Sequence, residues 1–177
     1  MTKPSESITE RLRVVPPGAA RDAYWDLLLL ADESEPAVRS YYQDGDLYVY
    51  EETGDGRRTA DGEWTILGMI LVLPDEHDDV GTVELKAVAV TPERHGQRVG
   101  QRMLAAVLAE LRRRDVPRVT VGTGNSGIGQ LAFYQKAGFR LSHIERDFFS
   151  VERGYPDGIE ENGIPLRDMV WMDQRLA

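Results

Sequence analysis

The sequence predicts a mixed α/β fold of the α+β kind, in which helices pack on the faces of a mixed sheet. Three observations predict this fold. The chain has 177 residues, of which 41% are hydrophobic and 29% charged, as is typical of one domain with a full core. Strand-like segments follow one another in its first half, and strand-like and helix-like segments alternate in its second half. We expect residues 1–9 to be a flexible N-terminus and residues 10–177 to form a single domain.

In the first half, two short helices are predicted between a first strand and two longer strands. Apolar side chains recur at positions i, i+3, i+4 and i+7 from Ala20 to Ala31, which predicts a helix. Pro36 ends that pattern and opens the second helix. Gly68 interrupts an apolar strand, which indicates a bulge or a close approach of two backbones. The predicted elements are the strand Arg11–Val15, the helices Ala20–Ala31 and Ala37–Tyr42, a turn at Asp44–Asp46, the strand Leu47–Glu51, a solvated hairpin loop at Thr53–Glu63 and the strand Trp64–Leu73.

In the second half, the predicted strands are separated by two longer helices. Apolar residues form a buried stripe from Val99 to Leu111 along the first of these helices. Gly138 is well placed as the residue that follows the second helix. Residues 145–167 have no regular pattern and are expected to be irregular. The predicted elements are an acidic turn at Pro74–Gly81, the strand Thr82–Val90, the helix Gln97–Arg114, the strand Arg118–Gly122, the helix Ile128–Ala137 and the strands Phe139–Ile144 and Asp168–Gln174.

Composition and charge argue against several classes of function. The net charge is −9, which disfavours nucleic acid or an anionic membrane as the main partner. The absence of cysteine excludes disulfides, a thiol nucleophile and cysteine-ligated zinc, and it fits a reducing compartment. His77, His95 and His143 lack the spacing of a metal site, so no metal is expected. The first ten residues lack the apolar core of a signal peptide, and the apolar runs are too short to span a bilayer, so we expect a cytoplasmic protein.

The stretch from residue 82 to residue 104, TVELKAVAVTPERHGQRVGQRML, has the features of an anion site. A strand leads through a loop with Gly and Arg into a helix, whose first N–H groups lack partners within the helix and carry partial positive charge. Arg94, Arg98 and Arg102 follow at intervals of four, so Arg98 and Arg102 are expected to share one helix face. This combination suits a pyrophosphate, although loops of this composition also occur as plain turns.

Two segments resemble a known superfamily. They are ELKAVAVTPERHGQRVGQRML and, at residues 125–139, NSGIGQLAFYQKAGF. Their order and separation resemble the GNAT superfamily of acyl-CoA-dependent N-acetyltransferases. The resemblance covers residues 64–144 well, and the tail DFFSVERGYPDGIEENGIPLRDM resembles a bacterial subgroup of mostly unassigned substrate. It implies the GNAT acyl-CoA N-acyltransferase fold, with a twisted mixed sheet of six or seven strands and helices on both faces.

The resemblance also implies an activity. It implies that acetyl-CoA, as co-substrate, gives its acetyl group to a primary amine by direct attack in a ternary complex. Glu84 is implied as the base that takes a proton from the amine, directly or through water, and Tyr134 as the acid that protonates the CoA thiolate. The implied acceptor is a small-molecule amine or a protein N-terminus. Family members often pair through their C-terminal strands, which implies a possible homodimer. The implied cofactor contacts are Val88, Ala89, Val90, His95, Gly96, Gln97, Arg98, Val99, Gly100, Gln101, Arg102 and Asn125.

The chain departs from the family pattern at three positions. His95 stands where Gln or Arg is usual, and Arg98 stands where the first Gly is usual, whereas Gly100 matches. Because only Gly enters the left-handed region freely, we expect Arg98 to have ordinary helical dihedral angles and its guanidinium to compensate as a donor to the phosphates. Asn125 lies further from Tyr134 than is usual, which predicts a wider loop between them.

Each candidate residue also has a structural interpretation. Glu84 could form an ion pair with a neighbouring strand, Tyr134 could be buried by packing, and Asn125 could cap a helix or form a turn. His95 could be an ordinary surface histidine. Two other functions stay open, namely a non-catalytic acyl-CoA-binding regulatory module and a protein-interaction domain without a cofactor.

Other features bear on the acceptor. Three acidic clusters could attract a cationic acceptor or could be solvated loops: Asp44–Asp46, Asp75–Asp79 and Asp157–Glu161. Several aromatic residues could line an acceptor pocket or pack in the core: Trp25, Tyr41, Tyr42, Phe148 and Phe149.

Overall fold

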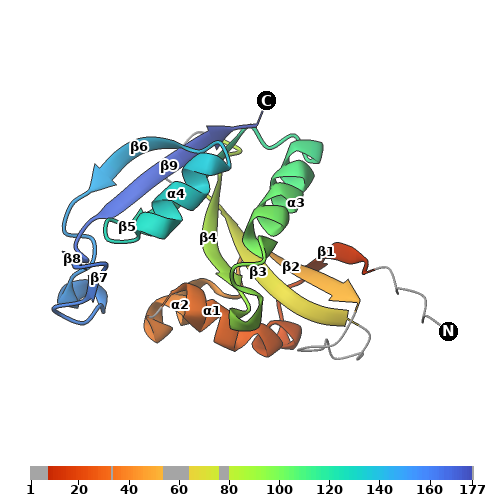
Figure 1. Cartoon of the computed structure of the whole chain (residues 1–177), viewed down its shortest axis with the longest axis horizontal. Coiled ribbons are helices and arrows are strands. Elements are labelled where there is room, and N and C mark those ends of the chain that lie inside the picture. Colours follow the sequence, from red (N-terminus) through yellow and green to blue (C-terminus); the bar gives the residue numbers. More distant parts are fainter. Residues whose placement is uncertain (1–7, 33, 54–63, 76–79, 177) are drawn as a thin grey trace.

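One seven-stranded sheet runs through the structure, with helices on both of its faces (Figure 1). The computed structural model describes residues 8–32, 34–53, 64–75 and 80–176. The strand order is β1-β2-β3-β4-β5-β9-β6. The strands are β1 (Glu10–Val15), β2 (Asp46–Thr53), β3 (Trp64–Pro74), β4 (Val83–Val90), β5 (Arg118–Gly124), β6 (Arg140–Glu145), the short pair β7 (Glu160–Glu161) and β8 (Ile164–Pro165), and β9 (Met169–Arg175). The helices are α1 (Trp25–Ala31), α2 (Glu35–Tyr41), α3 (Val99–Arg113) and α4 (Ile128–Lys136), with 3₁₀ turns at Ala19–Tyr24, Pro92–Arg94 and Val151–Arg153.

The sheet divides in its middle, between β4 and β5. All neighbouring strands are antiparallel except this pair, which is parallel and is joined only at Val83–Val119 and Glu84–Thr120. Beyond these residues β4 and β5 run apart (Figure 1). The outer edge of β4 from residue 85 to residue 90 is therefore unpaired, and its backbone polar groups are open to a ligand.

Two hydrophobic clusters hold the helices to the sheet. Helices α1 and α2 lie on one face, where Leu27, Leu28 and Val38 pack against inward-facing residues of β2, β3 and β4. Helix α3 lies on the other face, and its buried stripe from Val99 to Leu111 confirms the stripe that the sequence predicts. Helix α4 packs on the same side as α3, against β6. The predicted mixed fold with helices on both faces is thus confirmed.

The predicted helix over residues 20–31 differs from the structure. It is divided into a 3₁₀ turn and the shorter helix α1, which begins at Trp25. The reason is Arg21, which is fully buried and donates hydrogen bonds to the carbonyls of Val15, Tyr42, Asp44 and Gly45. A buried guanidinium must find such partners, and this requirement overrides the apolar period.

Both central strands carry a bulge. At Gly68 the pairing of β3 with β2 shifts, and a Cβ atom at this position would lie only 2.5 Å from the Ala89 carbonyl oxygen, which confirms the predicted close approach. In β4, Lys86 is the extra residue, because Leu85 and Ala87 pair with successive residues of β3. As a result, Leu85 packs on the α3 side of the sheet and Ala87 on the α1 side.

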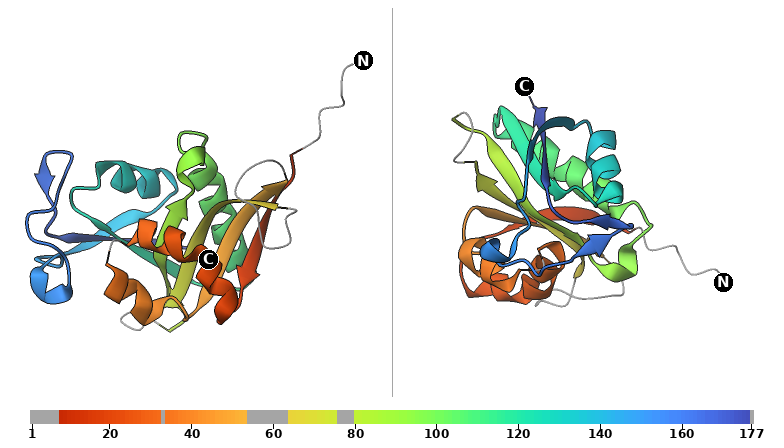
Figure 2. Two further views of the ribbon diagram at one scale, coloured as in Figure 1. Left: turned by 90° about the horizontal axis from the view of Figure 1, so that it is seen from below. Right: turned by 90° about the vertical axis from the view of Figure 1, so that its left-hand side faces the viewer.

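The segment between β6 and β9 projects beyond the end of the sheet (Figure 2). It was predicted to be irregular, but it contains a 3₁₀ turn and the two-residue strands β7 and β8. The remaining predicted elements lie within a few residues of their observed bounds, and Gly138 follows α4 in the left-handed conformation as expected.

Some predictions concern residues outside the described part of the chain. Most of the hairpin loop Thr53–Glu63 and half of the turn Pro74–Gly81 lie there, as do residues 1–7. The division into a flexible N-terminus and one domain over residues 10–177 therefore stays a prediction. Of the helices in the described residues, none is long and apolar enough to cross a membrane.

Candidate active site

A groove of about 750 Å³ follows the open edge of β4 and the beginning of α3. We call it the main groove. It collects residues of β4, of the loop before α3 and of α4, which are far apart in the sequence. Of the predicted cofactor contacts, those that line it are Val88, Ala89, Val90, His95, Gly96, Arg98, Val99, Gly100 and Gln101. Gln97, Arg102 and Asn125 do not line it.

The backbone of β4 forms one wall of the main groove. Its outer edge is unpaired at Val88 and Val90, because β5 has already turned away. The side chain of His95 lies beside this edge, with Nε2 3.0 Å from the carbonyl oxygen of Val90. The groove therefore presents peptide-like donors and acceptors, as a strand with one free edge does.

The beginning of α3 forms the other wall. Arg102 donates the first helical hydrogen bond, to the Arg98 carbonyl, so the N–H groups of Val99, Gly100 and Gln101 precede the helical ladder. Gly100 lets α3 approach closely, because a Cβ atom there would already lie 3.4 Å from both Phe133 and Val90. The helix start thus offers free N–H groups beside the open strand, which suits an anion.

Arg98 contradicts one expectation. It was expected to have ordinary helical dihedral angles, but its φ is 59° and its ψ is 19°, in the left-handed region. Gly96, two residues earlier, also has a positive φ of 77°. The loop therefore has a glycine-like conformation at residue 98, which the side chain disfavours.

The other two arginines of this stretch make contacts within the protein. Arg102 Nη2 lies 2.7 Å from Glu10 Oε1, and Arg102 Nη1 donates to the Gln97 carbonyl at 2.9 Å. Arg94 forms an ion pair with Glu52 and also lines the main groove. Since Arg98 precedes the helix in the left-handed conformation, it does not continue a regular helical row with Arg102.

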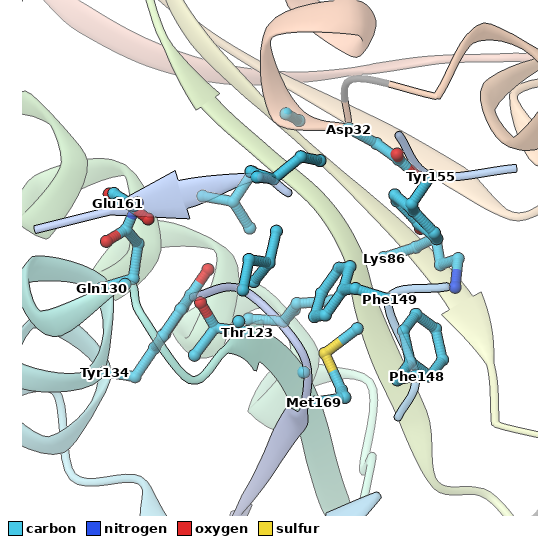
Figure 3. A pocket seen from close by; sticks show the side chains of 18 of the residues that line it. Asp32, Lys86, Thr123, Gln130, Tyr134, Phe148, Phe149, Tyr155, Glu161 and Met169 are labelled. Carbon is cyan, nitrogen blue, oxygen red and sulfur yellow. The ribbon is translucent and has the colours of Figure 1, made fainter. Parts of the chain in front are cut away.

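A second cavity, of about 360 Å³, shares lining residues with the main groove. Figure 3 shows the side chains that line this second cavity. We call it the side cavity. Leu30, Val88, Gln130 and Tyr134 line both spaces, so these residues mark the junction. The side cavity receives side chains from the end of α1, from β4 and β5, and from the segment between β6 and β9. Its polar and aromatic lining residues include Asp32, Glu84, Lys86, Thr123, Gln130, Tyr134, Phe148, Phe149, Tyr155 and Glu161.

Tyr134 lies at the junction on α4. It is only 7% exposed, and its ring packs edge-on against Phe133 and Phe139. Its hydroxyl forms no hydrogen bond with the part of the chain that the structure describes, and it points into the side cavity (Figure 3). Burial raises the pKa of this hydroxyl above its ordinary value, so the group keeps its proton at neutral pH.

Glu84 lies on β4, on the sheet face that carries α1 and α2. Its Oε1 atom is 3.2 Å from Nζ of Lys86, so its ion pair is with a lysine of the same strand and not with a neighbouring strand. Glu84 also lines a third space of about 360 Å³, the outer cavity, together with Asp75, Thr120, His143 and other residues of β5, β6 and β9. Glu84 therefore lines two separate spaces.

Asn125 lies outside both the main groove and the side cavity. Its Oδ1 accepts hydrogen bonds from the backbone N–H groups of Arg167 and Asp168, and its Nδ2 donates to the Pro165 carbonyl. These bonds tie the end of β5 to the segment before β9. These hydrogen bonds support the structural interpretation of Asn125, whereas its contact with a cofactor stays a prediction.

The acidic and aromatic residues predicted to face an acceptor divide into two groups. Phe148 and Phe149 line the side cavity. Trp25 and Tyr42 instead pack edge-on against each other, and the buried Tyr41 donates its hydroxyl to Asp32. Of the acidic clusters, the one at 157–161 reaches the side cavity through Glu161. Of the described residues in the other two, Asp75 lines the outer cavity and Asp46 is paired with Arg114.

Four lining residues of the side cavity were not predicted from the sequence: Asp32, Lys86, Gln130 and Tyr155. They come from a helix end, a bulge, an exposed helix face and an irregular segment, and no periodic pattern brings such residues together. The bulge at Lys86 had no glycine to indicate it. Among the described residues, no group of three or more metal-ligating side chains is present.

Comparisons with known proteins agree on one family. Residues 19–139 match the sequence model of the "Acetyltransferase (GNAT) family". The chain is 34% identical over 161 residues to YvbK, described as an uncharacterized N-acetyltransferase of Bacillus subtilis, and the match covers 91% of this chain and 94% of that protein. A Bacillus subtilis acetyltransferase in complex with CoA has a TM-score of 0.77 at 31% identity, covering 96% of this chain and 100% of the other. A GNAT family acetyltransferase from Elizabethkingia anophelis with acetyl-CoA bound has a TM-score of 0.72 at 32% identity, covering 97% of this chain and 99% of the other.

Proposed function

Since this chain belongs to the GNAT family of acetyltransferases, we propose that it transfers the acetyl group of acetyl-CoA to a primary amine by direct attack in a ternary complex. One observation carries the proposal. The main groove and the side cavity meet at Val88 and Tyr134, where β4 and β5 separate. Two substrates that enter from opposite sides of the split sheet can therefore meet at one point.

The main groove fits acetyl-CoA. The free N–H groups at the start of α3 and the guanidinium of Arg98 suit its pyrophosphate, and the open edge at Val88 and Val90 suits the amides of its pantetheine arm. When bound, acetyl-CoA supplies an activated acetyl thioester. The backbone N–H groups near Val90 are in reach to polarise its carbonyl. The carbonyl of Val90 already contacts His95, and its second lone pair can accept an amide N–H of the pantetheine.

Glu84 is the proposed base. An amine attacks only in its neutral form, and a carboxylate in the side cavity can take the proton directly or through a water. Because Glu84 also lines the outer cavity, the proton has a second side through which it can leave to solvent. Tyr134 is the proposed acid. In sum the ammonium loses two protons, of which one reaches the CoA sulfur through Tyr134 and the other passes from Glu84 to solvent.

The acceptor is proposed to be a small-molecule amine or a protein N-terminus that enters through the side cavity. A cytoplasmic location is part of the same proposal, because the reaction draws on the acetyl-CoA pool of the cell. The predicted pairing of two copies through C-terminal strands stays a prediction, which light scattering of the purified protein tests.

A thermal-shift experiment with acetyl-CoA tests the cofactor, with dephospho-CoA and ATP as controls. A ligand at a hundred times its Kd stabilises the folded state by about 2.7 kcal/mol, which for a domain of this size raises Tm by roughly 5–10 °C. Release of CoA in the presence of a panel of primary amines then tests catalysis. A shift without CoA release from any amine would favour the non-catalytic acyl-CoA-binding module. No shift at millimolar acetyl-CoA would favour the interaction domain without a cofactor.

A further inference from the structure

The side cavity has two chemically different ends (Figure 3). At one end lies Tyr134, more than nine-tenths buried, with its unpartnered hydroxyl pointing into the space. At the other end lie Asp32 and Tyr155. Burial raises the pKa of the Tyr155 hydroxyl, and the nearby Asp32 carboxylate raises it further. A single acceptor molecule that fills the cavity therefore meets a reacting end and a far end.

The far end combines a carboxylate with aromatic rings. The ring of Tyr155 packs edge-on against Phe149, with their centroids 4.9 Å apart, and both line the cavity. Asp32 accepts one hydrogen bond from Ser34 N–H and one from the Tyr41 hydroxyl. A carboxylate has about four acceptor positions, so it retains room for a further donor. A carboxylate beside aromatic faces is a favourable setting for an ammonium group.

The chain already places one ammonium group in a comparable setting, formed by Glu84 and Tyr41. Lys86 Nζ lies 3.2 Å from Glu84 Oε1 and 5.4 Å from the centre of the Tyr41 ring, whose hydroxyl contacts Asp32. The side cavity thus already holds a primary ammonium between a carboxylate and an aromatic ring.

The charges that line the side cavity favour an acceptor with a second cationic group. The side cavity is lined by the carboxylates of Asp32, Glu84 and Glu161 and by one cation, Lys86. Lys86 offsets Glu84, with which it is paired. An acceptor that carries only its reacting ammonium offsets one of the two remaining carboxylates and loses its charge during the reaction. An acceptor with a second ammonium leaves neither carboxylate without a counter-charge before the reaction and still offsets one of them after it.

We propose that the acceptor is an aliphatic diamine or polyamine. Its far ammonium binds Asp32 and the faces of Tyr155 and Phe149, while its near amino group lies at Tyr134 and receives the acetyl group. The C–N bond forms as the C–S bond of the thioester breaks, and the far ammonium keeps its proton throughout. This inference rests on the proposed function, and it makes Asp32 and Tyr155 specificity-determining residues.

The test compares three acceptors with the same five-carbon chain at saturating acetyl-CoA: 1,5-diaminopentane, pentylamine and 5-aminopentan-1-ol. Because a hydrogen bond to a charged group contributes about 1.5–3 kcal/mol, kcat/KM for the diamine is expected to exceed the other two about 10- to 100-fold, mainly through KM. Asp32→Asn is expected to remove most of this advantage and to change the rate with pentylamine far less. Glu35→Gln, which removes an exposed carboxylate of the neighbouring helix α2, is the charge-matched control and should leave all three rates as they are.

A second pair of variants tests the aromatic face without removing a charge. Tyr155→Phe keeps the ring and should keep the preference for the diamine, whereas Tyr155→Leu should weaken it. Equal kcat/KM for pentylamine and 1,5-diaminopentane in the unaltered protein would overturn the inference and leave amine acetylation standing. A preference for 2-phenylethylamine over 1,5-diaminopentane would also overturn the inference and leave amine acetylation standing, because the aromatic side chains would then bind a ring and not an ammonium group. CoA release with none of these amines would count against the proposed function itself.

Discussion

Lys86 and Glu84 form an ion pair inside the side cavity, with Nζ and Oε1 3.2 Å apart. Both side chains lie on the α1 side of the sheet, and the bulge at Lys86 is what lets Val88 and Val90 face the α3 side immediately afterwards. The same strand can therefore offer a carboxylate to one substrate and its open edge to the other. A sheet without the bulge would place Glu84, Val88 and Val90 on one face.

Replacing Glu84 by Gln should slow acetylation in a manner that depends on pH. A positioned base contributes about a hundredfold, so kcat/KM is expected to fall by about that factor at pH 7. An alkyl ammonium has a pKa of about 10, so raising the pH supplies neutral amine without a base. The gap between Glu84→Gln and the unaltered protein should narrow as pH rises from 7 to 10. Glu110→Gln, at an exposed ion pair on α3, is the matched control. An equal loss at both pH values would contradict the role of Glu84 as base.

Replacing Tyr134 by Phe removes only the hydroxyl. The ring contacts with Phe133 and Phe139 remain, so the fold and the acetyl-CoA Kd should change little. The loss is expected in kcat, by about a hundredfold, because the departing thiolate then lacks a proton donor. Steady-state kinetics and equilibrium binding of acetyl-CoA measure the two quantities separately. An unchanged kcat would remove Tyr134 from the mechanism.

The sequence could predict features that rest on local patterns. The stripe from Val99 to Leu111 and the glycine after α4 are such features, because a helical period and a left-handed cap are encoded within a few residues. A motif indicated Tyr134, as the implied acid, but not that two spaces share this residue. The far end of the side cavity was not predicted, because Asp32 and Tyr155 come from segments without periodicity and meet only through the fold. Helix α1 was misjudged at its start because the burial of Arg21 is a tertiary effect.

Arg98 adopts the left-handed conformation that glycine adopts freely, which makes a stability prediction possible. Arg98→Gly should raise the free energy of unfolding by about 1 kcal/mol, because the left-handed region costs a residue with a side chain about 1–2 kcal/mol. It should also weaken acetyl-CoA binding, since the guanidinium is lost. Arg98→Ala is the matched variant, because it loses the same guanidinium and keeps the unfavourable backbone. Urea unfolding should give Arg98→Gly a higher free energy of unfolding than Arg98→Ala. Equal free energies of unfolding would show that residue 98 carries no backbone strain.

Several buried tyrosines make the fold sensitive to alkaline pH. Burial raises the pKa of Tyr155 to about 12, and burial raises the pKa of Tyr134 and Tyr41 further. The folded state thus holds these protons more tightly than the unfolded chain, in which a tyrosine has a pKa of about 10. The resulting stability is fully present below pH 10 and is lost as pH rises from about 10 toward 12. Tm should therefore fall steadily above pH 10.

Tyr155→Phe should reduce this alkaline loss, because one titrating group is removed and no described hydrogen bond is broken. Absorbance near 295 nm, a wavelength at which tyrosinate is seen, should show Tyr41, Tyr134 and Tyr155 ionising together with unfolding and not before it. Early ionisation of all tyrosines near pH 10 in the folded protein would contradict the prediction.

Variants of Asn125 distinguish its structural role from the cofactor contact that the family resemblance implies. Its side chain makes three hydrogen bonds with the backbone of residues 165–168, which precede β9 and support one wall of the side cavity. Asn125→Ala leaves these groups without partners, so we expect a loss of about 2 kcal/mol, or roughly 4–8 °C in Tm. The KM for the amine should rise, because the wall of the side cavity loosens, while the Kd for acetyl-CoA should stay the same.

Asn125→Asp tests which of the three hydrogen bonds of this side chain stabilise the fold. An aspartate still accepts from the N–H groups of Arg167 and Asp168 but cannot donate to the Pro165 carbonyl, so it should lose less stability than alanine. If instead both variants keep their Tm and bind acetyl-CoA more weakly, Asn125 contacts the cofactor as the resemblance implies. The backbone contacts of Asn125 would then be incidental, and the segment before β9 would have to be held by β9 itself through its pairing with β5 and β6.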